Sequence, residues 1–330
     1  MNPHDPGGAG ARAQGAANLA LIKYMGKRDA ATNTPHNPSL SLTLPHLVST
    51  VSVSDAAAES DRWQYLPGAG DVALRLTAGG ERRFLAHVRR LCDHWDHRRR
   101  VLVRSANNFP ADAGIASSAS SFCAATRAVA AFLRRDETAP ELAQLSRAGS
   151  GSSCRSFFAP WCLWDGDAIG ALDFPLDPLL HMVVIVDGGR KQVSSSEAHA
   201  RVLTSPRFAG RADRARRRLS DLVQALSASD WRSACEISSA EYLDMHQLFA
   251  TSDPPFGYRA PPSDAIAAEC AALWSRHGDG PLVTMDAGPN VHLLFRQDQR
   301  GLVPRLAERY SRSHRVLSSE PETEWATSAR

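Results

Sequence analysis

A run of small and hydroxyl residues at positions 107–121 has the composition of an anion-binding site. Pro110 and Gly114 punctuate a short loop, and Ser117 and Ser118 stand where a helix is expected to begin. The first N–H groups of a helix have no partner within the helix and lie at the positive end of its dipole, so they bind phosphate readily. A lone pair of serines would favour an ordinary helix cap, but the whole run favours a phosphate site.

The spacing of this run, Pro110-x-x-x-Gly114-x-x-Ser117-Ser118-Ala119, differs from the Walker pattern and from the dinucleotide-binding glycine pattern. It resembles the phosphate loop of the GHMP kinase superfamily, a group of small-molecule, ATP-dependent enzymes. The resemblance implies ATP as a co-substrate together with Mg²⁺. It assigns ATP binding to Asn108, Pro110, Gly114, Ile115, Ala116, Ser117, Ser118 and Ala119.

Cations gather at the end of an apolar segment near the start of the chain. Residues 17–22 have the apolar density of a buried strand, and Lys23, Lys27 and Arg28 follow within six residues. A buried cation costs free energy unless an anion is close to it. The segment is therefore either a solvated strand end or a phosphate-binding site, and its residues alone leave both interpretations open.

Two later stretches also carry residues that could do chemistry. The cluster at 149–156 combines glycines and serines with Arg155, whose planar guanidinium suits carboxylate or phosphate oxygens, so it is a flexible loop or a second anion site. Asp286 lies in a tight turn between the expected strands 281–285 and 291–295. An aspartate in such a turn is ordinarily structural, because its side chain bonds the local backbone.

Six separated motifs between Asn18 and Phe295 resemble, in the same order, those of the diphosphomevalonate decarboxylase family, a branch of the GHMP superfamily. They include the stretch 18–27, the spaced residues 33–43, the Gly-Ser-Gly-Ser-x-Cys-Arg-Ser string at 149–156, the element 191–195 and the string Met-Asp-Ala-Gly-Pro-Asn at 285–290. This chain departs from the family pattern at Met25, where Trp is usual, and at Ser196, Ala198 and His199, where Arg or Thr, Gly and Met are usual.

The resemblance implies ATP-dependent decarboxylation of (R)-5-diphosphomevalonate to isopentenyl diphosphate in the mevalonate pathway of isoprenoid biosynthesis. It implies that Asp286 acts on the tertiary hydroxyl group, that Arg155 orients the carboxylate and that Lys23 is the third catalytic candidate. The implied substrate-binding residues are Asn18, Tyr24, Lys27, Ser150, Gly151, Ser152, Arg155 and Ser195. No metal-ligand cluster is evident in the sequence.

Two alternatives remain open at this stage. The departures from the family pattern at Ser196, Ala198 and His199 leave room for a decarboxylase or 3-kinase that acts on mevalonate monophosphate or mevalonate. A catalytically inactive binding protein on the same fold is the second alternative. Retention of Lys27, Arg155, Asp286 and the serine loop together favours an enzyme.

The expected fold class is α+β, with two GHMP-kinase-like domains and the active site in the cleft between them. We expect a flexible extension at 1–15, an N-terminal ATP-binding domain at 16–185, a ferredoxin-like C-terminal domain at 186–317 and a mobile tail at 318–330. Separate strands are expected at 39–44, 48–53, 72–76, 101–105 and 180–187. Helices are expected at 81–95, 117–133, 140–147, 207–227, 231–249 and 262–277.

Composition limits the class of protein. The 330 residues are 43% hydrophobic and 22% charged, with a net charge of +3, which suits a chain with a substantial core. The six cysteines show no Cys-x-x-Cys spacing and are expected to be reduced, packed thiols. No signal peptide or membrane span is evident, so a cytoplasmic location is expected. The partners expected are small molecules, without nucleic acid or membrane, and a homodimer is left open.

Overall fold

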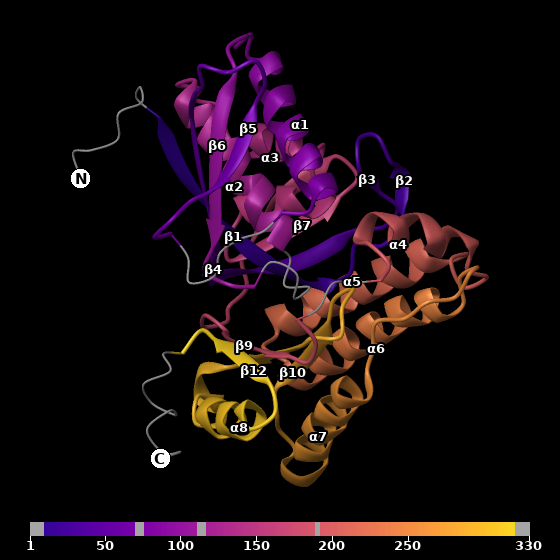
Figure 1. Cartoon of the computed structure of the whole chain (residues 1–330). Helices are drawn as coiled ribbons and strands as arrows, with labels where there is room; N and C mark the ends of the chain where they lie inside the picture. The colour runs from indigo at the N-terminus through magenta and orange to yellow at the C-terminus, as the bar shows by residue number, and fades with distance from the viewer. Residues whose placement is uncertain (1–9, 70–75, 111–116, 189–191, 321–330) are drawn as a thin grey trace.

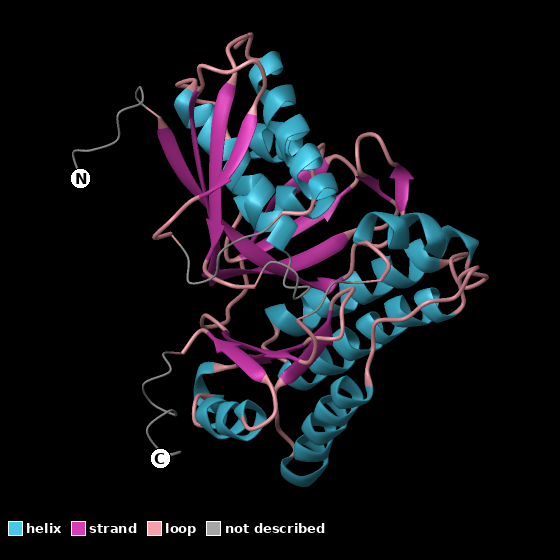
Figure 2. Ribbon diagram, viewed as in Figure 1, coloured by secondary structure: helices cyan, strands magenta, loops and turns pink. Residues whose placement is uncertain are grey.

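The structure is a computed structural model that describes residues 10–69, 76–110, 117–188 and 192–320. Its elements form two layered domains, one above the other in Figure 1, and each domain combines a sheet with helices (Figure 2). The expected α+β class is confirmed.

The N-terminal domain is built on a six-stranded sheet. Its strands are β1 (Ala11–Ile22), β4 (Ser39–Asp55), β5 (Arg62–Tyr65), β6 (Val101–Asn107), β7 (Trp161–Asp165) and β8 (Ala168–Leu172). β4 is the organising strand, because it pairs with β1 through residues 40–44 and 48–53, with β6 through residues 49–55 and with β7 through residues 39–42. A separate ribbon joins β2 (Lys27–Asp29) to β3 (Thr34–Pro35).

The expected strands 39–44 and 48–53 are a single strand, which corrects the prediction from periodicity. The register between β1 and β4 shifts between Ala16 and Ala17, whose partners are Val48 and Leu44. The residues skipped include Pro45, which has no N–H to donate and so is tolerated at such an irregularity. Most of the expected strand 72–76 lies outside the described residues.

Helices of the N-terminal domain are α1 (Ala78–His94), α2 (Ser117–Phe132) and α3 (Ala139–Arg147), and a 3-10 helix, η1 (Gly151–Phe157), follows α3. α2 packs closely on β1 and β4 because its inward face consists of alanines and other small residues. A side chain at Gly15 of β1 would come within 2.4 Å of the Ser120 carbonyl oxygen. The small residues of α2 and Gly15 thus set the distance at which the helix lies over the sheet.

The C-terminal domain has a four-stranded antiparallel sheet in the order β10-β11-β9-β12, made of β9 (Leu180–Ile185), β10 (Leu282–Met285), β11 (Val291–Phe295) and β12 (Arg315–Ser318). Its helices are α4 (Ser195–Arg201), η2 (Val202–Thr204), α5 (Arg211–Ser227), α6 (Trp231–Ala250), α7 (Pro261–His277), η3 (Gln297–Gln299) and α8 (Leu302–Ser311). The connections run strand, helices, strand, strand, helix, strand, which is the ferredoxin-like arrangement expected.

Apolar side chains cover both faces of this sheet. Met182, Val184 and Leu293 pack toward α7 and α8, whereas Val183 and Leu294 belong to a cluster that also contains side chains of α5, α6, β1 and β4. One hydrophobic core therefore runs across the boundary between the domains and holds them together.

The strand pairing changes two of the expected boundaries. Residues 11–15, assigned to a flexible extension, are paired with β4 as part of β1. β9, assigned to the end of the N-terminal domain, is a central strand of the C-terminal sheet, so the boundary lies before Leu180. The six cysteines are free and buried, which confirms the prediction of packed thiols.

Candidate active site

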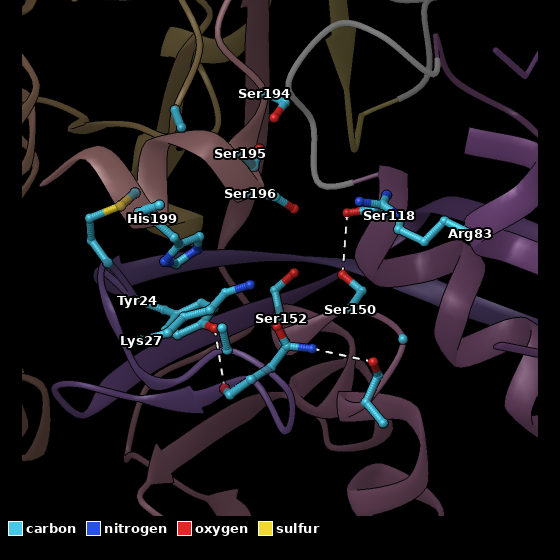
Figure 3. Close-up of a pocket in the computed structure, with 18 of the residues that line it drawn as sticks. Tyr24, Lys27, Arg83, Ser118, Ser150, Ser152, Ser194, Ser195, Ser196 and His199 are labelled. Atoms are coloured by element: carbon cyan, nitrogen blue, oxygen red, sulfur yellow. Dashed lines mark hydrogen bonds between the residues drawn. The ribbon is translucent and has the colours of Figure 1, made fainter. Parts of the chain in front are cut away.

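A cavity of about 790 Å³ opens between the two domains. The N-terminal domain contributes the end of β1, one face of α1, the start of α2 and the loop that leads into η1. The C-terminal domain contributes α4, Met245 of α6 and the turn after β10. Figure 3 shows Tyr24, Lys27 and His199 on one side of this cavity and Ser118 and Arg83 on the other, with Ser150 and Ser152 between them.

Lys23 and Asp286 form an ion pair in the wall of the cavity. The Lys23 Nζ lies 2.7 Å from Asp286 Oδ1, and it also donates to the Ala20 carbonyl oxygen at 2.6 Å. The Lys23 side chain is only 2% exposed, whereas that of Asp286 is 24% exposed. Asp286 therefore presents a carboxylate to the cavity, and Lys23 supports it from behind.

The charges around this pair decide its protonation. Burial raises the pKa of Asp286, but Lys23, His292 and Arg155 together lower it by more, so the net pKa lies below the ordinary value of 3.8. Burial lowers the pKa of Lys23, against the opposing effect of Asp286. The lowered pKa of Asp286 leaves its carboxylate ionised near neutral pH. An ionised carboxylate can accept a hydrogen bond from a hydroxyl group bound in the cavity.

A buried charge cluster holds the Lys23 backbone in place. The Lys23 N–H donates to Glu241 Oε1 at 3.0 Å, and its carbonyl oxygen accepts from Arg211 Nη2 at 3.1 Å. Arg211 and Glu241 are fully buried and bond each other, and Arg211 also bonds Asp244 at 3.0 Å. Helices α5 and α6 thus fix the end of β1, where Lys23 leaves the strand.

Arg155 is a second buried cation that faces the cavity. It is 5% exposed, and its guanidinium donates to Asn18 Oδ1 at 2.9 and 3.1 Å and to Ser39 Oγ at 3.0 Å. Both partners are uncharged, and among the described residues no carboxylate pairs with Arg155. A buried guanidinium without a counterion is suited to an anionic ligand.

The serine-rich loop approaches the start of α2. Ser150 Oγ lies 3.5 Å from Ser118 Oγ, so the two predicted anion sites meet in one cavity (Figure 3). Gly151, which follows Ser150, lies against the ring of Tyr24. A Cβ atom at Gly151 would come within 2.6 Å of the Tyr24 hydroxyl oxygen, so a glycine is needed for this contact.

The lining of the cavity is strongly cationic. Its cations are Lys23, Lys27, Arg83, Arg90 and Arg155, and Asp286 is the one carboxylate among the described residues that line it. Burial, and then the charge of Arg83, lowers the pKa of Lys27, so these cations repel one another. Anionic ligands would relieve that repulsion.

Most of the predicted site residues that the structure describes line this cavity, namely Lys23, Tyr24, Lys27, Ser117, Ser118, Ser150, Gly151, Ser152, Arg155, Ser195 and Asp286. Asn18 does not line it and instead lies behind Arg155. Asn108 braces β4, accepting from the Val48 N–H at 2.7 Å and donating to the His46 carbonyl oxygen at 2.9 Å.

Five other predicted ATP-binding residues are not placed in the lining. Pro110 and Ala119 are described but do not line the cavity, and Ala119 is fully buried in α2. Gly114, Ile115 and Ala116 lie outside the described residues.

Helix α1 also contributes to the cavity, which was not predicted from the sequence. Arg83, His87 and Arg90 of this helix line the cavity. Their spacing places them on one helical face, and this was the available signal. It was obscured because other basic residues, such as Arg82 and Arg89, are interspersed along α1.

Two negative findings concern the described residues. Among them, no group of three or more His, Cys, Asp or Glu side chains could hold a metal ion. None of the helices described is long and apolar enough to span a membrane.

The chain has two α+β domains with a cationic cavity between them, and a helix that begins with serines faces this cavity. These features define the class of GHMP-kinase-like proteins. Residues 15–171 match the diphosphomevalonate decarboxylase-like N-terminal domain, and residues 181–327 match the mevalonate 5-diphosphate decarboxylase C-terminal domain. The chain belongs to the diphosphomevalonate decarboxylase family, which confirms the resemblance found in the sequence.

Individual relatives agree with this assignment. The diphosphomevalonate decarboxylase of Ganoderma lucidum is 31% identical over 311 residues, which cover 85% of this chain and 77% of the relative. The crystal structure of a mevalonate diphosphate decarboxylase from Legionella pneumophila is 42% identical, with a TM-score of 0.87, and the match covers 94% of this chain and 100% of that one. A structure of MDDEF in complex with MVAPP, AMPPCP and magnesium is 28% identical, with a TM-score of 0.81 and coverage of 94% and 99%.

Proposed function

We propose that this chain is an enzyme that catalyses the ATP-dependent decarboxylation of (R)-5-diphosphomevalonate to isopentenyl diphosphate, releasing ADP, phosphate and carbon dioxide. One observation carries the proposal: the ionised Asp286, held by Lys23, shares a cationic cavity with Arg155, which has no carboxylate partner among the described residues. The substrate brings a hydroxyl group, a carboxylate and a diphosphate, and this cavity offers a complement to each.

Asp286 is the group that acts on the tertiary hydroxyl of the substrate. Its ionised carboxylate accepts the hydroxyl hydrogen bond and aligns the oxygen for attack on the γ-phosphorus of ATP. As the new O–P bond forms and the bond to ADP breaks, the hydroxyl proton passes to this carboxylate. The lowered pKa makes Asp286 a weak base, so orientation of the nucleophile is the larger part of its role. Lys23 keeps the carboxylate ionised and in place.

Arg155 holds the substrate carboxylate. Asn18 and Ser39 occupy three of its N–H positions and fix the plane of the guanidinium, which leaves the remaining donors for a carboxylate in the cavity. After phosphorylation, the tertiary C–O bond breaks and phosphate leaves. The C–C bond to the carboxylate carbon then breaks as well and carbon dioxide is released. The electron pair of that C–C bond forms the double bond of the product.

The two polyanionic groups bind on opposite sides of the cavity. The ATP phosphates bind at the start of α2, where Ser117 and Ser118 offer hydroxyls and Arg83 adds a positive charge. Hydroxyl and phosphate oxygens are ligands that Mg²⁺ accepts, so Ser117 and Ser118 would help the ATP phosphates to hold a magnesium ion, which would neutralise the phosphate charge. The substrate diphosphate binds beside Tyr24 and Lys27, with Ser150, Ser152 and Ser195 around it.

Product analysis tests this proposal. The purified chain is incubated with ATP, Mg²⁺ and, in separate reactions, mevalonate, mevalonate 5-phosphate or mevalonate 5-diphosphate. We expect ADP, carbon dioxide and isopentenyl diphosphate in equal amounts from the diphosphate. ADP without carbon dioxide would identify a kinase, release of carbon dioxide only from the monophosphate would reassign the substrate, and no turnover with any of the three would favour a binding protein.

Two finer points of the proposal rest on the sequence. A cytoplasmic location stays a prediction, and the six free, buried cysteines suit a reducing compartment. Assembly as a homodimer also remains a prediction.

A further inference from the structure

His199 is a cavity residue to which the proposed reaction gives no role. It belongs to α4, in the short stretch where this sequence departs from the family pattern. Its ring lies over that of Tyr24, with 4.3 Å between the ring centroids, and it is 9% exposed. In Figure 3 it lies above Tyr24 and Lys27, on the side of the cavity away from Ser118 and Arg83.

A backbone hydrogen bond decides which nitrogen of His199 carries the proton. The Gly26 N–H lies 3.0 Å from His199 Nδ1. An N–H group can only donate, so Nδ1 must accept and the proton of the neutral ring lies on Nε2. Gly26 has φ +86°, a backbone conformation that glycine favours, and its turn therefore keeps the N–H directed at the ring.

The Nε2–H group is available to a ligand. On an imidazole ring, Nε2 points away from Nδ1 and therefore away from Gly26. Nε2 has no hydrogen-bond partner among the described residues. It is also not one of the fully buried polar atoms that lack a partner there, so it is accessible from the cavity that His199 lines. Within the part of the chain that the structure describes, no acceptor is bonded to this donor, which is therefore suited to an acceptor on a bound molecule.

The surroundings favour an anionic acceptor. Burial, and then the charges of Lys27 and Arg155, lower the pKa of His199 to about 3, so the ring is neutral at physiological pH. Lys27 has no carboxylate partner among the described residues and lies on the same side of the cavity. A neutral donor beside a cation binds a phosphoryl oxygen without adding to the repulsion among the cations.

We propose that the His199 Nε2–H group donates a hydrogen bond to a phosphoryl oxygen of the substrate diphosphate, alongside Lys27. This inference rests on the proposed function, because it assigns the diphosphate rather than ATP to this side of the cavity. His199 is then a residue that determines affinity for the phosphorylated end of the substrate, and it acts through direct contact.

Two variants that resemble different halves of the imidazole test the inference. His199→Asn places an amide near the Nδ1 position, where its oxygen can accept from Gly26, but it has no donor at the Nε2 position. His199→Gln can place its amide N–H near the Nε2 position. A hydrogen bond to a charged group is worth about 1.5–3 kcal/mol. We therefore expect His199→Asn to raise the KM for diphosphomevalonate about 10- to 100-fold, while His199→Gln recovers most of the loss.

The KM for ATP is expected to stay within a few-fold of the parent in both variants, because His199 lies away from Ser118 and Arg83. His94→Asn, at an exposed histidine in the last turn of α1, is the matched control and should change neither KM value. An unchanged KM for diphosphomevalonate in His199→Asn would overturn the inference. Equal losses in both variants, with equal drops in melting temperature, would also overturn it, because they would show that His199 acts by packing on Tyr24.

A binding experiment separates this inference from the proposed function. Calorimetry with inorganic pyrophosphate needs no turnover, and we expect weaker binding in His199→Asn than in the parent and His94→Asn. If the parent turns over no mevalonate derivative but binds pyrophosphate in this His199-dependent way, the anion contact stands and the proposed function fails. If the parent neither turns over nor binds pyrophosphate, both fail.

Discussion

At the scale of single residues, Asp286 differs from an ordinary turn aspartate in its partner. An aspartate in a tight turn normally bonds the local backbone, but the Asp286 carboxylate pairs with Lys23, which lies 263 positions away in the chain. The pair places one carboxylate in a cavity otherwise lined by cations. That position is consistent with a group that orients a bound hydroxyl.

Replacement of Asp286 by Asn tests this role. Asp286→Asn keeps the shape of the side chain but removes its charge, so we expect turnover to fall by roughly 10²–10⁴-fold, as for the loss of an acid–base group. ATP binding, measured by calorimetry, should persist. Asp279→Asn, which changes a partly exposed carboxylate paired with Arg296, is the control and should retain turnover. If Asp286→Asn keeps nearly the turnover of the parent, Asp286 has a purely structural role in its turn.

The dependence of activity on pH tests the effect of Lys23 on Asp286. If the carboxylate is the active form, activity is lost as pH falls through the pKa of Asp286, which lies below 3.8 in the parent. In Lys23→Met the ammonium is absent while burial remains, and burial raises the pKa. We expect the acid limb of kcat/KM to move to higher pH in Lys23→Met. The acid limb of Lys23→Met is measured on its residual activity. If it lies at the same pH as in the parent, Lys23 does not control the ionisation of Asp286.

At the scale of elements, helices α5 and α6 position the end of β1. Glu241 and Arg211 bond the N–H and the carbonyl oxygen of Lys23, and Arg218 and Asp244 complete the cluster. Part of the arginine-rich helix α5 is thus buried. Arg211 is fully buried, whereas Arg216 of the same helix is 56% exposed.

These two arginines give a matched pair of variants. Arg211→Met leaves Glu241 buried without its main counterion, so we expect the free energy of unfolding to fall by about 3–5 kcal/mol. Arg216→Met breaks only an exposed pair with Asp165 and should cost about 1 kcal/mol or less. Urea denaturation of both variants measures the difference. Similar stabilities would mean that the buried cluster does not hold β1 in place.

At the scale of the whole molecule, the cavity depends on how the two domains meet. Lys23 and Arg155 come from the N-terminal domain and Asp286 from the C-terminal one, and the apolar cluster that joins β1 and β4 to α5 and α6 sets their separation. Ligands bound between the domains therefore contact both of them.

This arrangement predicts that substrate and nucleotide stabilise the molecule as a unit. A ligand at 100 times its dissociation constant adds about 2.7 kcal/mol to the stability of the folded state. With diphosphomevalonate and a non-hydrolysable ATP analogue present, we expect one thermal transition at a higher temperature. Arg155→Met should reduce the shift caused by diphosphomevalonate more than the shift caused by the analogue. Two separate transitions, only one of them shifted, would show that the ligands contact a single domain.

The sequence by itself determined the family, the fold class and most of the catalytic candidates. Helix starts such as Ser117, the helices at 231–250 and 261–277 and the short strands around Asp286 are encoded in neighbouring residues, through capping and periodicity. The motifs carry Lys23, Arg155 and Asp286 in runs of a few residues, so they could be found without a structure.

Only the tertiary structure decided how these residues are partnered. Lys23 and Asp286 are 263 residues apart in the chain, Arg155 and Asn18 are 137 apart, and His199 and Gly26 are 173 apart. No local pattern in the sequence encodes contacts between such distant positions. Three other features were missed for the same reason. They are the continuity of β4 through Pro45, the membership of β9 in the second sheet and the contribution of α1 to the cavity. Each depends on which segments pack together, because pairing and burial are properties of the folded chain rather than of a short segment.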